Sequence, residues 1–132
     1  MFSYPSSIYV HLPWCHLKYP YCDFNSTVLS DESDLSKYTK LIVKDIENEA
    51  RKFEKSKIRT IFIGGGTPNL FDPLSISEIL NSINTNFDIK SNCEITMEIN
   101  PKFVSEAELV QYRAAGVNRL SVGAQSFNQK LL

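Results

Sequence analysis

The sequence predicts an α/β fold built on a parallel sheet of about four βα units. Short runs of β-branched and apolar residues alternate with longer stretches in which apolar residues recur at helical spacing. A strand-then-helix order that repeats implies parallel strands joined by right-handed crossovers. Composition does not shift along the 132 residues, so we expect a single domain over residues 1–132.

The first half of the chain contains two predicted strands and a long helix. Residues 8–12 form a short apolar run that Pro13 ends, which is typical of a strand. Apolar residues then recur at helical spacing from residue 34 to residue 55, which predicts the first helix. Residues 58–63 are the second predicted strand, and three consecutive glycines close it.

The second predicted helix begins with a capping signal. Ser75 and Glu78 match the capping-box pattern, and Leu74 and Ile79 are placed as a hydrophobic staple around it. Its spacing predicts an inner face of Ile76, Ile79, Leu80, Ile83 and Phe87.

The last part of the chain repeats the same plan. Residues 94–99 and 117–122 are the third and fourth predicted strands. Between them, Ser105 and Glu108 form a second capping-box pattern, and Gly116 is the expected C-cap of the third helix.

Charge and hydropathy exclude several classes of protein. Fourteen basic residues nearly balance fifteen acidic ones, so no basic field predicts nucleic-acid binding. No apolar run approaches the ~20 residues of a membrane span. The first residues have neither the charged nor the apolar region of a signal peptide, so we expect a cytoplasmic protein.

Three cysteines are present, Cys15, Cys22 and Cys93. An odd number in a cytoplasmic chain argues against a disulfide framework. Metal binding and chemistry stay open, as does the alternative of three buried thiols that pack as small apolar side chains.

Residues suited to ligand binding gather where the predicted strands end. Ligands of parallel α/β sheets bind beyond the carboxyl ends of the strands. Each of the four predicted strands is followed there by a polar, cysteine-containing or glycine-rich segment: residues 13–24, residues 64–68, Glu98 with Asn100, and Gly123 with Gln125 and Ser126. Taken singly, the glycines could form an ordinary tight turn, Glu98 a solvated strand end, His11 a hydrogen-bonded core histidine, and Tyr9 and Tyr21 packing aromatics.

Taken together and in order, these motifs resemble the oxygen-independent coproporphyrinogen III oxidase-like proteins of the radical S-adenosylmethionine (SAM) superfamily. The matching segments are Tyr9-x-His11-x-Pro13-Trp14-Cys15, Cys22-Asp23-Phe24-Asn25, Gly64-Gly65-Gly66-Thr67-Pro68, Glu98-x-Asn100-Pro101, and residues 115–127. Asp23-Phe24 after the last cysteine is more similar to the heme chaperone branch than to the oxidases. The resemblance implies the N-terminal third of such a protein, with an incomplete (β/α)6 radical SAM (TIM-like) barrel.

The resemblance also implies cofactors and roles. Cys15 and Cys22 would be thiolate ligands of a [4Fe–4S] cluster whose open iron chelates SAM. Gly65, Gly66 and Thr67 would line the methionine end of SAM, Glu98 would bind its ribose, and Gln125 would add a polar contact. Tyr9 would lie beside the cluster and SAM, and Tyr21 near the adenine. Heme or a porphyrin is the further ligand that the resemblance implies.

One position departs from the motif of the family. The cluster requires a third cysteine at position 19, and this chain has Tyr19 there. A phenol with a pKa near ~10 is protonated at neutral pH and is a poor replacement ligand. His16 is out of register, and Cys93 belongs at the other end of its strand. The sequence therefore predicts little or no intact cluster, and leaves three functions open: a radical SAM protein, a non-catalytic heme carrier, or an inactive fragment.

Overall fold

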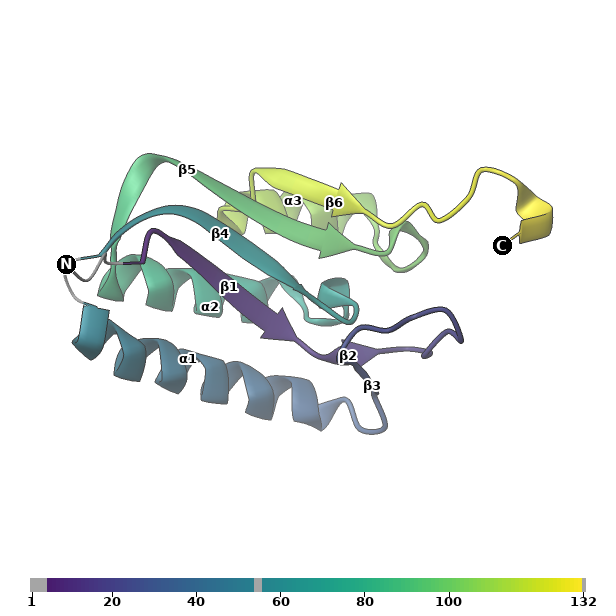
Figure 1. Cartoon of the computed structure of the whole chain (residues 1–132), viewed down its shortest axis with the longest axis horizontal. Coiled ribbons are helices and arrows are strands. Elements are labelled where there is room, and N and C mark those ends of the chain that lie inside the picture. The colour runs from purple at the N-terminus through teal and green to yellow at the C-terminus, as the bar shows by residue number, and fades with distance from the viewer. Residues whose placement is uncertain (1–4, 54–55, 132) are drawn as a thin grey trace.

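The computed structural model of the chain describes residues 5–53 and 56–131 and contains a four-stranded parallel sheet. The strands lie in the spatial order β1-β4-β5-β6, so each new strand is added on the same side of the sheet (Figure 1). Their bounds are Ser7–Leu12 for β1, Lys57–Gly65 for β4, Asp88–Ile99 for β5 and Arg119–Val122 for β6. The predicted α/β class, parallel sheet and order of elements are thus confirmed.

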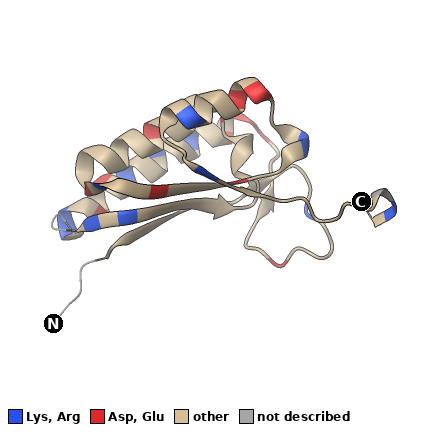
Figure 2. Cartoon of the chain, turned by 90° about the horizontal axis from the view of Figure 1, so that it is seen from above, with Lys and Arg blue, Asp and Glu red and all other residues tan. Residues whose placement is uncertain are grey.

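Three helices form one layer on one face of this sheet (Figures 1 and 2). They are α1 (Ser33–Phe53), α2 (Pro73–Asn86) and α3 (Glu106–Ala115). Short elements fill the loops: strands β2 (Trp14–Cys15) and β3 (Thr27–Val28), and 3₁₀ turns η1 (Pro68–Leu70), η2 (Pro101–Phe103) and η3 (Gln129–Leu131). The pair β2–β3 had no sequence signal because each strand has two residues.

The hydrophobic core lies between the helix layer and the sheet. Alternation along each strand sends every second side chain to the helices, and the register aligns these side chains across strands. Val10 on β1 pairs with Ile63 on β4, and Ile63 pairs with Met97 on β5. All three are buried, together with Ile76, Ile79, Leu80 and Ile83 of α2. The predicted inner face of the second helix is confirmed for these four residues, and Phe87, which caps the helix, is half-buried.

The opposite face of the sheet is largely polar. The Thr60 hydroxyl on β4 donates to the Ser7 hydroxyl on β1 at 2.8 Å. Farther across the sheet, Arg119 lies 3.3 Å from the Thr96 hydroxyl and 3.7 Å from the Glu94 carboxylate. Tyr9 on β1 stacks on its cross-strand partner Phe62 on β4, with ring centroids 6.1 Å apart. This face therefore presents hydrogen-bonding side chains rather than a bare apolar surface.

The start of α2 differs from the prediction. Asp72 is the N-cap, its carboxylate accepts the Ser75 N–H at 2.6 Å, and Pro73 takes the first helical position. Leu74 is 80% exposed, so the predicted staple with Ile79 does not form. The helix starts at the Asp-Pro pair because the Asp72 carboxylate satisfies a free backbone N–H at the N-cap. Proline suits the first helical position because it has no backbone N–H that would need a partner.

The start and end of α3 agree with the prediction. Ser105 and Glu108 form a reciprocal capping box, with Glu108 N–H to Ser105 Oγ at 3.2 Å and Ser105 N–H to Glu108 Oε2 at 2.8 Å. Gly116 is the C-cap and has a φ of 121°, which favours glycine.

The strand and helix bounds shift by a few residues from those expected. β4 continues two residues beyond residue 63 into the glycines, and β5 begins at Asp88 instead of residue 94. Cys93 therefore lies inside β5 and is buried. Residues 54 and 55, where the first helix was predicted to end, lie outside the described residues.

Positions of charged residues of both signs are interspersed along the helices and strands in the view of Figure 2. Over residues 5–53 and 56–131, no helix combines the length and the apolarity that crossing a membrane requires.

Candidate functional site

The glycine turn after β4 packs directly against the end of β1. The backbone N–H of Gly66 donates to the carbonyl oxygen of Leu12 at 2.8 Å. Gly65 has a φ of +127°, and a Cβ on it would lie 2.7 Å from the same carbonyl oxygen. The turn therefore requires glycine at position 65, both for its backbone conformation and for this close approach.

The first cysteine lies against the same turn. Cys15 is buried, and a Cβ on Gly66 would be 2.8 Å from its sulfur and 2.5 Å from the carbonyl oxygen of Trp14. The N–H of Thr67 donates to that carbonyl oxygen at 2.8 Å. The structure thus brings Cys15 together with Gly66 and Thr67, which lie 51 and 52 positions later in the chain.

Glu98 reaches the turn from the neighbouring strand. It lies next to last in β5, and its Oε2 accepts the backbone N–H of Gly65 at 3.1 Å. The carboxylate is half-buried at the carboxyl edge of the sheet. A fixed anionic acceptor at this edge of the sheet is suited to binding hydroxyl groups of a small ligand.

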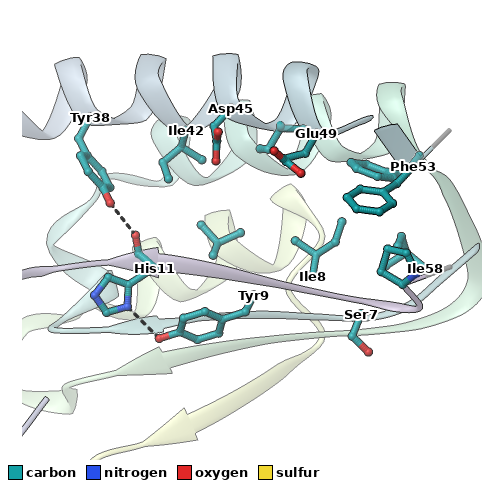
Figure 3. A pocket seen from close by; sticks show the side chains of 14 residues that line it. Ser7, Ile8, Tyr9, His11, Tyr38, Ile42, Asp45, Glu49, Phe53 and Ile58 are labelled. Atoms are coloured by element: carbon teal, nitrogen blue, oxygen red, sulfur yellow. Dashed lines mark hydrogen bonds between the residues drawn. The ribbon is translucent and has the colours of Figure 1, made fainter. Parts of the chain in front are cut away.

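Tyr9 and His11 share the open face of β1 and form a hydrogen-bonded pair (Figure 3). His11 Nε2 lies 2.9 Å from the carbonyl oxygen of Asn25, which can only accept, so in the neutral imidazole Nε2 carries the proton. Nδ1 then accepts the Tyr9 hydroxyl at 3.0 Å. Partial burial and the nearby charge of Glu98 raise the pKa of Tyr9, which keeps its hydroxyl a donor. His11 is hydrogen-bonded as expected, but on the open face.

Residues 16–26, which we call the cysteine loop, connect β2 to β3. The Lys18 ammonium donates to the carbonyl oxygen of Ser26 at 3.3 Å and bridges the loop. Tyr19 stacks on Tyr21 with ring centroids 5.4 Å apart and an interplanar angle of 12°. The Cys22 N–H donates to the Tyr19 carbonyl oxygen at 2.9 Å, which closes a turn.

The donors of this loop and of Cys15, which directly precedes it, do not fit a [4Fe–4S] cluster. Cys15 packs against Gly66, and the phenol of Tyr19 is stacked on its neighbour Tyr21. His16 packs on Phe103 with centroids 4.3 Å apart, so it does not replace the absent thiol. Among the residues that the structure describes, no group of three or more His, Cys, Asp or Glu side chains could hold a metal ion. Two thiols are fewer than a cubane cluster requires.

Two of the predicted SAM residues stand apart from this cluster of groups. Tyr21 is exposed and stacks on Tyr19. Gln125 has a φ of 56° and is exposed, with its side-chain nitrogen turned back over Gly123. Their roles toward SAM stay predictions.

Two residues position the site in ways that the sequence did not indicate. Asn69 is buried, its Oδ1 accepts the Asn100 N–H at 2.8 Å, and its Nδ2 donates to the Phe103 carbonyl oxygen at 2.9 Å. It therefore joins the loops after β4 and β5. Asn25 acts through its backbone, which no side-chain pattern could indicate. The alternation of residues 8–12 could have placed Tyr9 and His11 on one face.

A groove of about 420 Å³ runs along the other side of β1, under α1 (Figure 3). Residues 7–11 of β1 contribute to its lining, but the glycines, Glu98 and the cysteines do not. The Tyr38 hydroxyl donates to the His11 carbonyl oxygen at 3.1 Å within it. The groove is thus separate from the carboxyl edge where the predicted ligand residues gather.

Comparison with known proteins relates this arrangement to one superfamily. The family model described as the radical SAM superfamily matches residues 9–132. Heme chaperone HemW of Escherichia coli (strain K12) is 41% identical over 128 residues, which are 97% of this chain and 34% of that protein. The oxygen-independent coproporphyrinogen III oxidase of Salmonella typhimurium is 32% identical over 96% of this chain and 28% of that protein.

The fold leads to the same relatives. The structure of coproporphyrinogen III oxidase (HemN) from Escherichia coli, described as a radical SAM enzyme, superposes with a TM-score of 0.90 and 31% sequence identity. The match covers 96% of this chain and 29% of that one. This chain spans about a third of the length of the curated relatives that it matches.

Proposed function

Because the chain belongs to the radical SAM superfamily, we propose that its carboxyl edge binds S-adenosylmethionine as part of a protein that acts in heme metabolism. The observation that carries this proposal is the carboxylate of Glu98, held 3.1 Å from the Gly65 N–H at the mouth of the glycine turn. An anionic acceptor in that position suits the paired hydroxyls of a ribose.

The residues around Glu98 support an adenosyl ligand. Gly66 is partly exposed next to the buried Gly65, so the methionine end of the ligand could approach the turn at Gly66. Thr67 follows them, and Tyr9 with its raised pKa keeps a neutral hydroxyl on the same face. Gln125 and Tyr21 would complete the site from the loops after β6 and β2.

The proposal does not include radical chemistry in this chain. A bound [4Fe–4S] cluster would supply the electron that cleaves SAM, but Cys15 and Cys22 lack a third thiolate partner, and Tyr19 occupies its position. SAM would also lose its chelation by iron. We therefore expect weak binding of an intact ligand through the protein groups alone.

A role in heme handling is favoured over oxidation of a porphyrinogen. Identity to the heme chaperone of Escherichia coli is 41%, against 32% to the coproporphyrinogen oxidase of Salmonella typhimurium. Asp23-Phe24 after Cys22 points the same way. A non-catalytic heme carrier is the second candidate, and an inactive fragment is the third.

Isothermal titration of the 132-residue chain with SAM tests the proposal. Glu98→Gln should weaken binding by ~1–3 kcal/mol, the cost of losing hydrogen bonds to a charged group. Glu94→Gln is the matched control, since Glu94 lies on the same face of β5, four residues before Glu98 and beside Arg119. Equal affinity for SAM in the Glu98 variant and the unmodified chain would reject the assigned site.

A hemin titration separates the remaining alternatives. Saturable binding of hemin by a chain that holds no iron–sulfur cluster supports the heme carrier. Absence of both SAM and hemin binding leaves the inactive fragment.

A further inference from the structure

Gly64, the first of the three glycines, lies between two functional side chains on the open face of the sheet. It pairs with His11 on β1. Because Ile63 pairs with Met97 on β5, the next residue of each strand, Gly64 and Glu98, also lie side by side. Phe62 precedes Gly64 by two residues on the same face, stacked on Tyr9. The space above Gly64 is therefore enclosed by three side chains and has none of its own.

The carboxylate of Glu98 occupies that space. A Cβ on Gly64 would lie 2.9 Å from Glu98 Oε2 and 3.2 Å from its Cδ. It would also lie 2.8 Å from Cε1 of Phe62. From this place over β4, the same Oε2 accepts the Gly65 N–H at 3.1 Å.

We propose that Gly64 is a positioning residue for Glu98: its missing side chain lets the carboxylate cross β4 and bond to Gly65. This inference rests on the proposed function in one respect, that Glu98 binds the ligand. Gly64 needs no left-handed backbone, since the glycines with positive φ are Gly65 and Gly116. An alanine side chain is therefore compatible with the backbone at position 64, and its cost falls on the side chains above it.

Two side chains are in the way, Phe62 and Glu98, and Glu98 has the greater freedom to move. The Phe62 ring is held by its stack on Tyr9. Glu98 has a long side chain with several rotatable bonds, and among the described residues its hydrogen bond is the one to Gly65. Alanine at position 64 should thus displace Glu98 from Gly65 and leave the strands in place.

The other two glycines have a different role. A Cβ on Gly65 would meet the Leu12 carbonyl oxygen at 2.7 Å, and one on Gly66 would meet the Trp14 carbonyl oxygen at 2.5 Å. Backbone atoms inside a sheet cannot give way as a side chain does. Substitution at 65 or 66 should therefore destabilise the fold itself, whereas substitution at 64 should disable Glu98 within an intact fold.

The first experiment compares Gly64→Ala, Gly65→Ala and the unmodified 132-residue chain by thermal unfolding and SAM titration. Gly64→Ala should keep the unfolding midpoint and bind SAM about ten- to hundredfold more weakly, as Glu98→Gln does. The double variant should be no weaker than either single one, because both remove the same interaction. Gly65→Ala should lower the midpoint. Unaltered SAM affinity in Gly64→Ala, with weakened affinity in Glu98→Gln, would overturn the inference.

A second measurement does not depend on SAM. In a ¹H–¹⁵N correlation spectrum, the Gly65 amide reports whether a carboxylate accepts its proton. Glu98→Gln should shift that resonance when position 64 is glycine. It should leave the resonance unmoved in the Gly64→Ala variant, in which Glu98 is already displaced from Gly65. An equal shift in both backgrounds contradicts the positioning role. The expected shifts together with unaltered SAM affinity in Glu98→Gln would support the positioning of Glu98 and reject its proposed ligand.

Discussion

His11 Nε2 lies 2.9 Å from the carbonyl oxygen of Asn25, a residue fourteen positions later in the chain. This contact ties β1 to the far end of the cysteine loop, residues 16–26. The same ring accepts the Tyr9 hydroxyl on its other nitrogen. His11 thus holds together the sheet, the loop that contains Cys22, and one of the predicted SAM residues.

We expect His11→Leu to loosen the cysteine loop. Loss of the bond to Asn25 removes about 1 kcal/mol, so the half-buried Cys22 should react with a thiol reagent about fivefold faster. Cys15 and Cys93 are buried and should react slowly in both proteins. Tyr9→Phe is the control, because it keeps the bond to Asn25. Equal rates for Cys22 in His11→Leu and Tyr9→Phe would contradict this role.

The unmodified chain should bind little iron after anaerobic reconstitution, and Tyr19→Cys should bind more. The substitution restores a third thiolate between Cys15, at the end of β2, and Cys22 in the cysteine loop. Iron and sulfide analysis, together with the broad visible absorbance of thiolate-bound clusters, measures the change. Tyr19→Ser controls for loss of the stack with Tyr21 and should gain nothing. A near-stoichiometric cluster in the unmodified chain would overturn the expectation.

Tyr112→Phe should lower the free energy of unfolding by about 1–3 kcal/mol. The buried Tyr112 hydroxyl donates to the Phe71 carbonyl oxygen at 2.7 Å and joins α3 to the loop before α2. Phenylalanine fills the same space but leaves that buried carbonyl without its partner. Urea unfolding measures the difference. Tyr19→Phe, in an exposed loop, should change stability little.

The same tyrosine predicts a loss of stability at alkaline pH. Burial, with the charges of Glu108 and Asp72, raises the pKa of Tyr112 well above its usual value near ~10. The stability that this group contributes is fully present below ~pH 10, and it falls as pH rises toward the folded-state pKa, because the unfolded state then releases its proton first. Urea midpoints measured across this range should fall less steeply in Tyr112→Phe. Parallel curves would exclude Tyr112 as the cause.

Strand β6 should promote self-association of the 132-residue chain. It is one of the two edge strands of the sheet, and on its helix side Leu120 is 40% and Val122 is 52% exposed. Edge strands with exposed apolar side chains are templates for pairing, and a lysine blocks this. Val122→Lys should therefore reduce oligomers in light scattering. Val110→Lys, at an exposed position on α3, should not. A monomeric unmodified chain would contradict the prediction.

Local sequence patterns predicted the secondary structure well where the signal and its partner lie within one turn. The Ser105–Glu108 capping box and the Gly116 C-cap depend on neighbours three or four residues away, and both form. At α2 two local signals competed, and Asp72-Pro73 took the position that had been assigned to Ser75. The choice between them depends on which backbone N–H groups are free, and a periodic pattern does not encode that.

By itself the sequence determined the order of strands and helices, the parallel sheet, the gathering of unusual residues at its carboxyl edge, and the superfamily. These follow from periodicity and from motifs whose spacing is fixed along the chain. The tertiary structure alone decided which of those residues touch. Glu98 bonds to Gly65 from 33 positions away, and its carboxylate lies over Gly64 because strands β4 and β5 are in register there. Such contacts depend on strand register and on the room that a missing side chain leaves, and both are properties of the assembled sheet.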